Sequence, residues 1–155
     1  MSAVAVRLAT AADLAAVLGL YAELAAGDPA REPPSLEDAR SLLEAALAQP
    51  GRSILVADGA GAVLGTADLL VVTNLSHRGA PWAIVENVVV AEAARRRGVG
   101  RALMARALEL AEEAGCYKLQ LLSMKHRTEA HAFYRGLGLE PLAEGFRLYF
   151  DDASF

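Results

Sequence analysis

The chain has 155 residues, is 54% hydrophobic, and carries a net charge of −4 at pH 7. This length can bury one core, so we expect a single domain over residues 1–155. The acidic balance excludes a general attraction to nucleic acid or to an anionic membrane, so any basic site must be local. No apolar run approaches the roughly 20 residues that span a bilayer. A lone cysteine, Cys116, and an N-terminus without a signal-peptide pattern indicate a cytoplasmic protein.

Up to residue 90 the pattern predicts one strand, two helices and three further strands. "VAVRL" (4–8) reads as a strand, and Thr10 with Asp13 resembles a capping box that starts a helix. Ser35 and Asp38 start a second helix after the loop "AAGDPAREPP". The apolar stripes expected on these helices are Leu14, Val17, Leu18, Tyr21 and Leu24, then Leu36, Ala39, Leu43, Ala46 and Leu47.

The remaining elements complete an α/β pattern with a mixed sheet. "SILVAD" and "AVLGTADLLVV" form a predicted hairpin, and "WAIVENVVV" is the next strand after the polar loop "TNLSHRGAP". A helix follows over 99–114, with Leu103, Ala107, Leu110 and Ala111 facing inward. "YKLQLLSM" predicts a strand, "EAHAFYRGL" a short helix, and "FRLYF" a last strand. The expected order is β α α β β β α β α β.

The stretch "ARRRGVGRAL" (94–103) places four arginines around a Gly-x-Gly step, between a strand and a helix. A helix N-terminus offers unpaired N–H groups and a partial positive charge, and glycines allow a phosphate to approach them closely. This arrangement favours a polyanion, most simply a pyrophosphate. The alternative is a solvated charge run ahead of an ordinary helix start.

Several other kinds of site fit poorly. Gly100 is followed by Arg101 and Ala102 rather than by the Lys and hydroxyl residue of a P-loop. Leu103 stands where a dinucleotide fingerprint needs its third glycine. The spacing of the three histidines does not suggest a metal site, and no local pattern supports a catalytic triad, although a triad of distant residues stays open.

Two motifs resemble the GNAT superfamily of N-acetyltransferases. "RRRGVG" (95–100) matches the Q/R-x-x-G-x-G/A loop that binds the acyl-CoA pyrophosphate in that family, and it follows the strand "NVVV". "AHAFYRGLGLE" resembles the second signature, A-x-x-F-Y-x-x-x-G-F. The resemblance covers essentially the whole chain and looks closest to the branch containing glucosamine-6-phosphate N-acetyltransferase. It implies the GNAT fold and acetyl-CoA as cosubstrate, with no metal.

The resemblance also implies a set of cosubstrate-binding residues. Backbone groups of the strand before the loop would bind the pantetheine arm, and the N–H groups of 96–101 would bind the pyrophosphate. Arg127 stands where the family often has Asn, so it either meets a CoA phosphate or that contact is absent. The full set is Val88, Val90, Arg95, Arg96, Arg97, Gly98, Val99, Gly100, Arg101 and Arg127.

Two residues are candidates for catalysis. Tyr134 matches the family tyrosine that commonly protonates the departing CoA thiolate; the alternative is a packing role on a stripe with Ala130, Phe133 and Leu137. Glu86 is a charged residue inside an apolar strand and matches a glutamate of the glucosamine-6-phosphate enzymes. It can be the base, a substrate anchor, or a salt-bridged structural residue.

The sequence therefore predicts an N-acetyltransferase that moves acetyl from acetyl-CoA to a primary amine of a small molecule by direct attack. The loops "AAGDPAREPP" and "TNLSHRGAP" are expected to line the acceptor site. The alternatives are acetylation of a protein or peptide amine, and a non-catalytic acyl-CoA-binding regulatory module. The resembled branch commonly forms two-fold dimers, and apolar edges such as "FRLYF" invite pairing, so we expect a homodimer.

Overall fold

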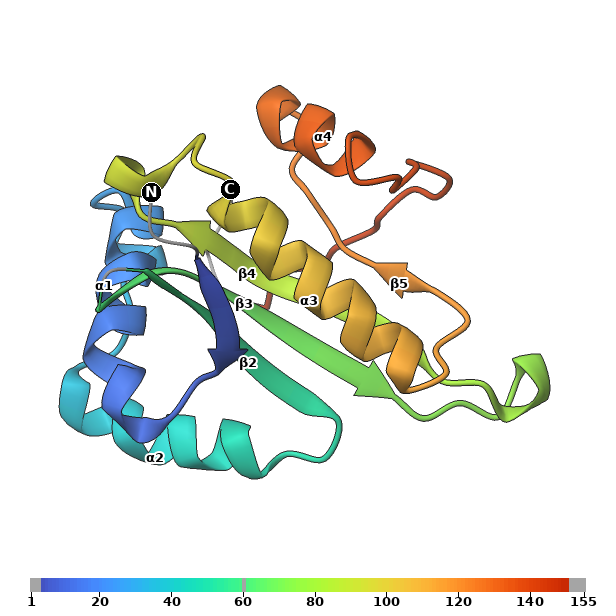
Figure 1. Cartoon of the computed structure of the whole chain (residues 1–155), viewed down its shortest axis with the longest axis horizontal. Coiled ribbons are helices and arrows are strands. Elements are labelled where there is room, and N and C mark those ends of the chain that lie inside the picture. The colour runs from blue at the N-terminus through green and yellow to red at the C-terminus, as the bar shows by residue number, and fades with distance from the viewer. Residues whose placement is uncertain (1–3, 60, 151–155) are drawn as a thin grey trace. The chain divides into compact units, whose positions relative to one another are not determined.

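The computed structural model describes residues 4–59 and 61–150. Within this range five strands form one sheet in the order β1-β2-β3-β4-β5 (Figure 1). The first three junctions are antiparallel, and β4 pairs with β5 in parallel, which makes the sheet mixed as predicted. The strands are β1 (Ala5–Leu8), β2 (Arg52–Gly59), β3 (Ala62–Val72), β4 (Trp82–Val90) and β5 (Leu119–Gln120).

The chain divides into two compact units, 1–120 and 121–155. The first contains the sheet with helices α1 (Leu14–Ala25), α2 (Leu36–Ala48) and α3 (Val99–Glu113). Its described residues also form four short 3-10 helices: η1 (Ala11–Asp13), η2 (Pro29–Arg31), η3 (His77–Gly79) and η4 (Glu92–Ala94). The second contains α4 (Thr128–Arg135), close to the helix predicted there.

The two faces of the sheet are covered by different helices. Ile54 and Val56 of β2 belong to the buried cluster that includes residues of α1 and α2. On the opposite face Gly65 of β3 lies against α3: a Cβ on Gly65 would stand 3.1 Å from side-chain atoms of Val99 and Leu103 and 2.8 Å from a carbonyl oxygen of β4. Glycine is therefore needed there for the close approach of α3, which crosses β3 and β4 in Figure 1.

Most of the predicted helical stripes are confirmed. Leu14 and Val17 are buried, and Leu18 and Tyr21 pack against the same cluster. On α3 the buried residues are Val99, Leu103, Met104, Ala107 and Ala111, of which Val99 and Met104 were not in the predicted stripe. Leu110, which was predicted to face inward, is only partly buried. The stripe on α2 was wrong at both ends, because Leu36 and Leu47 are 46% and 40% exposed. Helix α2 buries only its middle, at Ala39 and Leu43.

The predicted capping box at Thr10 is confirmed. The Asp13 carboxylate accepts hydrogen bonds from the Thr10 N–H at 2.8 Å and from its hydroxyl at 3.1 Å. Arg7 of β1 adds two more, each 2.8 Å long, and also reaches Asp58 of β2 at 3.2 Å. This network ties the start of the first helix to the edge of the sheet.

Of the predicted strands, the one over 117–124 was too long and the one over 146–150 was wrong. The stretch 117–124 forms a strand only at Leu119–Gln120, and 146–150 contains none. Its apolar residues are open to solvent, with Phe146 90%, Leu148 78% and Phe150 97% exposed. An alternating pattern produces a strand only where a partner strand supplies hydrogen bonds and a surface to pack against. The expected final strand is therefore missing from the observed order.

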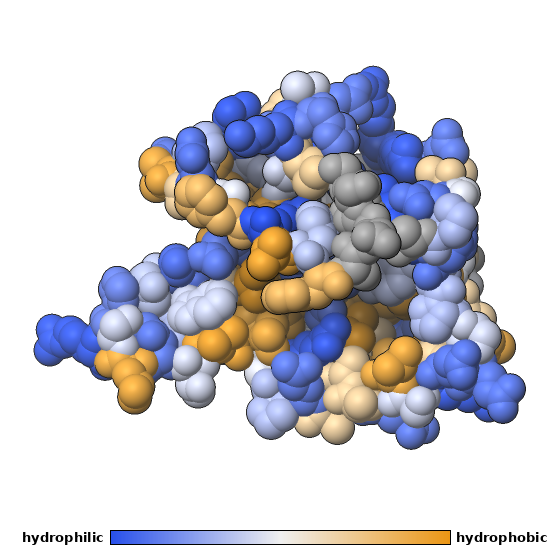
Figure 2. Space-filling view, turned by 180° about the vertical axis from the view of Figure 1, so that it is seen from behind, coloured by the Kyte–Doolittle hydropathy of each residue, from blue (hydrophilic) through white to orange (hydrophobic). Residues whose placement is uncertain are grey.

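The loop between β3 and β4 extends away from the sheet. It is the narrow projection at the left of Figure 2, where hydrophilic and hydrophobic residues mix at the tip. Leu75 in this loop is fully exposed, and the ring of His77, also in the loop, stacks on the ring of Tyr117 with centroids 3.9 Å apart.

Candidate functional site

The arginine and glycine stretch forms a turn that leads from β4 through η4 into α3. Two residues adopt left-handed backbone conformations, Arg96 with φ 59° and Gly98 with φ 83°. Gly98 is the N-cap of α3, and the first helical hydrogen bond runs from the Ala102 N–H to the Gly98 carbonyl at 2.9 Å. The amides of the first turn before Ala102 have no acceptor four residues back within the helix. Such a turn directs several N–H groups at one anion.

The charges of this turn face outward. Arg95, Arg96, Arg97 and Arg101 are all exposed, whereas Val99 is 1% exposed. Val99 therefore anchors the turn to the core while its neighbours present positive charge to solvent. The Arg95 Nε atom lies 3.4 Å from the Val90 carbonyl oxygen, which places this side chain along the end of β4.

Strand β4 contains a β-bulge at Asn87. Asp68 of β3 pairs with Glu86, but Thr66 pairs with Val89, so two residues of β4 oppose one of β3. Asn87 has φ 53°, a left-handed value that asparagine tolerates better than most residues.

The bulge reverses which side of the strand each backbone group faces. Before the bulge, the Ala83 N–H bonds to Lys118 on the β5 side; after it, the Ala91 N–H bonds to Leu64 on the β3 side. In a regular strand these two residues, an even number of positions apart, would face the same neighbouring strand. Counting back from Ala91 by the two-residue period of a strand, Val88 and Val90 face away from β3. Pairing between β4 and β5 in the described chain is recorded only at Ala83 and Ile84, so Val88 and Val90 lie beyond it.

Glu86 is exposed and lies on the face of the sheet that carries α1 and α2. Its cross-strand partner is Asp68, which is 7% exposed. Asp68 forms a two-point ion pair with Arg52 of β2, with one contact, from the arginine Nε, at 3.0 Å. Glu86 thus sits beside a buried carboxylate whose charge is already balanced by an arginine. Its part in the chemistry stays a prediction.

Tyr134 and Arg127 belong to the second unit. Arg127 is the exposed N-cap of α4. Tyr134 is half-buried, and its ring lies 5.2 Å from that of Phe133 at an interplanar angle of 59°. No residue of α4 is fully buried, so the helix does not carry a deep apolar stripe. The roles predicted for both residues remain predictions.

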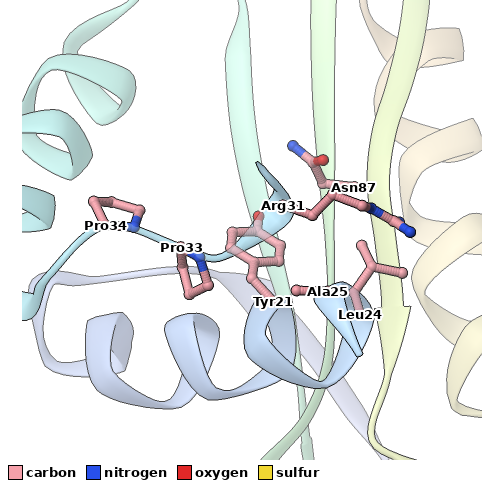
Figure 3. A pocket seen from close by; sticks show the side chains of 7 residues that line it. All are labelled: Tyr21, Leu24, Ala25, Arg31, Pro33, Pro34 and Asn87. Carbon is pink, nitrogen blue, oxygen red and sulfur yellow. The ribbon is translucent and has the colours of Figure 1, made fainter. Parts of the chain in front are cut away.

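A pocket of about 300 Å³ opens beside the bulge (Figure 3). This volume is at the lower end of the range for small-molecule sites. Its walls come from the end of α1, the loop from α1 to α2, and β4. The lining residues are Tyr21, Leu24, Ala25, Arg31, Pro33, Pro34 and Asn87. The loop "AAGDPAREPP" contributes Ala25, Arg31, Pro33 and Pro34 to this lining, whereas no residue of "TNLSHRGAP" is among the described residues that line it. That these loops line the acceptor site stays a prediction.

The pocket includes residues that sequence reasoning did not assign to a site. Tyr21 was expected only in the core stripe, but burial, together with the Asp68 charge, raises its pKa to about 12. Its phenol is therefore a neutral hydrogen-bonding group at physiological pH. Asn87 could have been suspected, because a polar residue beside Glu86 interrupts an otherwise apolar strand. Arg31 carried no signal in the sequence.

Two negative findings apply to the described residues. No helix within 4–59 and 61–150 is both long enough and apolar enough to cross a bilayer. In the same ranges, no three His, Cys, Asp or Glu side chains gather where they could hold a metal ion.

Comparisons with known proteins give one family. A family model described as acetyltransferase (GNAT) family matches residues 10–139. A probable glucosamine 6-phosphate N-acetyltransferase 2 of Oryza sativa subsp. japonica is 37% identical over 101 residues, covering 63% of this chain and 59% of the rice protein. The chain thus spans about three fifths of the length of that relative.

Solved structures match over nearly the full length. A putative acetyltransferase from Agrobacterium tumefaciens str. C58 has a TM-score of 0.88 and 40% identity, covering 94% of this chain and 99% of its own. A protein described as a transcriptional regulator from Bacillus halodurans C-125 has a TM-score of 0.85 and 28% identity, covering 96% of this chain and 100% of its own.

Proposed function

Because the chain belongs to the acetyltransferase (GNAT) family, we propose that it transfers the acetyl group of acetyl-CoA to a primary amine of a small molecule. The amine nitrogen forms a bond to the acetyl carbonyl carbon, and the carbon–sulfur bond of the thioester breaks. The ammonium proton leaves to a base, and the CoA thiolate takes up a proton. No covalent intermediate on the enzyme is needed.

The observation that carries this proposal is the position of β4. Its bulge at Asn87 lines the pocket, and its C-terminal end runs into the arginine and glycine turn. From Asn87 to Val90 the strand advances about 10 Å, at roughly 3.3 Å per residue. An acceptor in the pocket and a cosubstrate held along the end of β4 would therefore meet beside the same strand.

The residues of the turn suit the cosubstrate. The first-turn amides of α3 would hold the pyrophosphate, with the exposed arginines 95–97 and 101 adding charge around it. The backbone groups of Val88 and Val90 face away from β3, where they could bond to the amides of a pantetheine arm. One of these N–H groups would also polarise the thioester carbonyl.

For the general base and the general acid we keep the two residues that the sequence predicts, Glu86 and Tyr134. Glu86, one residue before the pocket wall at Asn87, would accept the ammonium proton directly or through water. Tyr134 would donate to the departing thiolate; a phenol and a thiol have ordinary pKa values of about 10 and 8.5, so this transfer is only modestly uphill. Arg127 would contact a CoA phosphate. We propose no role for a metal ion.

Two other functions remain candidates. A protein or peptide amine could be the acceptor, although a pocket of about 300 Å³ favours a small molecule. A regulatory module that binds acyl-CoA without turnover is the second, and the likeness to the Bacillus protein described as a transcriptional regulator supports it.

The test is a screen for thiol release from acetyl-CoA with a panel of amines. The panel includes glucosamine 6-phosphate, named in the rice relative, together with aminoglycosides, polyamines and peptides. We expect turnover with at least one small amine, well above the hydrolysis of acetyl-CoA alone. Binding of acetyl-CoA without turnover on any amine would contradict the proposal and favour the regulatory module.

A further inference from the structure

Two polar side chains of β3 lie buried on the face of the sheet that carries α1 and α2. Thr66 and Asp68 pair with Val56 and Ile54 of β2, and both of these belong to the buried cluster that α1 and α2 complete. Because residues directly opposite each other in a sheet share a face, Thr66 and Asp68 point toward these helices. They are 0% and 7% exposed, so each needs a polar partner within the protein.

Tyr21 of α1 connects these buried groups to the pocket beside the bulge. It lines the pocket, and its side chain extends from α1 toward the strands (Figure 3). Its hydroxyl is in hydrogen-bonding contact with the side chain of Thr66. Thr66 donates its own proton to the Leu55 carbonyl at 2.8 Å. A hydroxyl has a single proton, so toward Tyr21 the Thr66 oxygen can only accept. The phenol therefore donates inward and offers the lone pairs of its oxygen to the pocket.

The charges behind the phenol favour a cation in front of it. Asp68 forms its two-point ion pair with Arg52, in which the arginine Nε contact is 3.0 Å long. Burial and then the Asp68 charge raise the pKa of Tyr21 to about 12, and the Arg52 charge opposes this rise less strongly than Asp68 supports it. The phenol thus lies nearer the negative end of the ion pair. A ligand group at the phenol oxygen is favoured when it is both a hydrogen-bond donor and positively charged.

We propose that Tyr21 is a specificity residue that accepts a hydrogen bond from the ammonium group of the acceptor, while the Asp68 carboxylate behind it stabilises the positive charge. This inference rests on the proposed acetyltransferase function and names the residue that holds the amine in that site. An ammonium group has only donors, which matches an oxygen whose own proton is already used. Asp68 is also the cross-strand partner of Glu86, so the bound amine would lie beside the proposed base.

The first experiment compares ligands in which a hydroxyl replaces the amine. The pairs are cyclohexylamine with cyclohexanol and glucosamine with glucose. Calorimetric titration of each ligand into the protein needs no turnover. We expect the amine of at least one pair to bind at least about tenfold more tightly than its hydroxyl analogue, with the preference falling as salt is raised. Equal affinities in both pairs would overturn the inference.

Tyr21→Phe locates the preference, because it keeps the ring and removes only the accepting oxygen. It should lower the affinity for the amine about tenfold and change that for the hydroxyl analogue less than threefold. Tyr117→Phe removes a phenol hydroxyl that is exposed elsewhere, beside His77, and should change neither affinity. A lower thermal midpoint in Tyr21→Phe with the parental ratio of affinities would mean that the hydroxyl serves only Thr66, and the inference would be wrong.

Asp68→Asn tests the charge behind the phenol. It leaves Arg52 unbalanced, so the amine should lose its preference over the hydroxyl analogue. Asp58→Asn is the matched control, because Asp58 also pairs with an arginine, Arg7, at 3.2 Å, and it should keep the preference. Thermal midpoints show first that both variants fold; if Asp68→Asn does not fold, Tyr21→Phe decides alone.

Kinetics separate this inference from the proposed function. For an amine that is acetylated, Tyr21→Phe should raise the KM for the amine about tenfold, with kcat within threefold and acetyl-CoA affinity unchanged. If no amine is acetylated but amine binding depends on Tyr21, the function fails and the ammonium site stands. If amines are acetylated and Tyr21→Phe keeps the parental KM, the function stands and the ammonium site is wrong.

Discussion

Gly100 is the second residue of α3, and the absence of a side chain there matters for the proposed pyrophosphate site. Gly100→Val should block the approach of a phosphate to the first-turn amides without harming the helix, because valine has a better helix propensity than glycine. We expect acetyl-CoA affinity to fall at least tenfold, about 1.4 kcal/mol, with the thermal midpoint little changed. Calorimetric titration with acetyl-CoA measures this.

Helix α1 offers a matched control for this variant. A Cβ at Gly19 would meet nothing within 4 Å, so Gly19→Val adds the same side chain to a helix away from the turn. It should leave the affinity unchanged. Parental affinity in a folded Gly100→Val protein would remove the turn from the cosubstrate site.

The second residue-scale prediction concerns Tyr134. Tyr134→Phe keeps the aromatic ring beside Phe133 and removes only the hydroxyl. If that hydroxyl protonates the thiolate, kcat should fall about 10²-fold, or roughly 2.7 kcal/mol of barrier, with little change in acetyl-CoA affinity. Steady-state kinetics at saturating amine decide the matter. Turnover within about threefold of the parent would leave Tyr134 with a packing role alone.

At the scale of elements, the junction of β1, η1 and β2 should make stability depend on pH. Hydrogen bonds from Arg7, and then those from Thr10, hold the pKa of Asp13 well below its ordinary value, although burial opposes them. A depressed carboxylate pKa contributes stability above the unfolded value of about 3.9, and this contribution disappears as pH falls below it.

We therefore expect Asp13→Asn to lower the free energy of unfolding by about 2 kcal/mol at pH 7, since Arg7 is partly exposed and solvent screens its charge. The difference from the parent should shrink as the pH falls toward 3. Urea unfolding across this range measures it. Asp38→Asn, at the exposed start of α2, should cost less than about 1 kcal/mol. A pH-independent difference at Asp13 would contradict the assignment.

Elements with strong local signals could be predicted, whereas those that depend on tertiary contacts could not. The hairpin of β2 and β3, the capping residues of α1 and α2, and the turn into α3 all have a local chemical signature. The bulge in β4 has only the weak signal of Glu86 and Asn87, and one extra residue there reverses the backbone pattern that follows. Arg31 enters the pocket through the path of a loop, which no periodicity encodes.

For the whole molecule, the exposed segment 146–150 is the basis of a prediction about assembly. Phe146, Leu148 and Phe150 expose most of their surface, an unusual gathering of apolar side chains for a monomer. We expect them to be buried against a second copy of the chain. Light scattering at micromolar concentration should give twice the 16.3 kDa mass of one chain.

Two substitutions locate this contact. Leu148→Asp should shift the mass toward that of a monomer, because it places a charge within the apolar contact. Leu75→Asp, in the loop between β3 and β4, changes a leucine elsewhere that is even more exposed and should leave the dimer intact. A monomer in the parent protein would refute the expected dimer, and a dimer that survives Leu148→Asp would place the interface elsewhere.

The bulge in β4 has a consequence for how this protein could diverge. On one side of Asn87 the proposed site uses side chains, which substitutions alter directly. On the other side it uses the backbone of Val88 and Val90, which any residue able to form a strand would supply. Mutations around the pocket can therefore explore new acceptors while the cosubstrate contacts of the strand persist. The single extra residue in β4 would thus allow the acceptor specificity to change in evolution while the binding of the acetyl donor is kept.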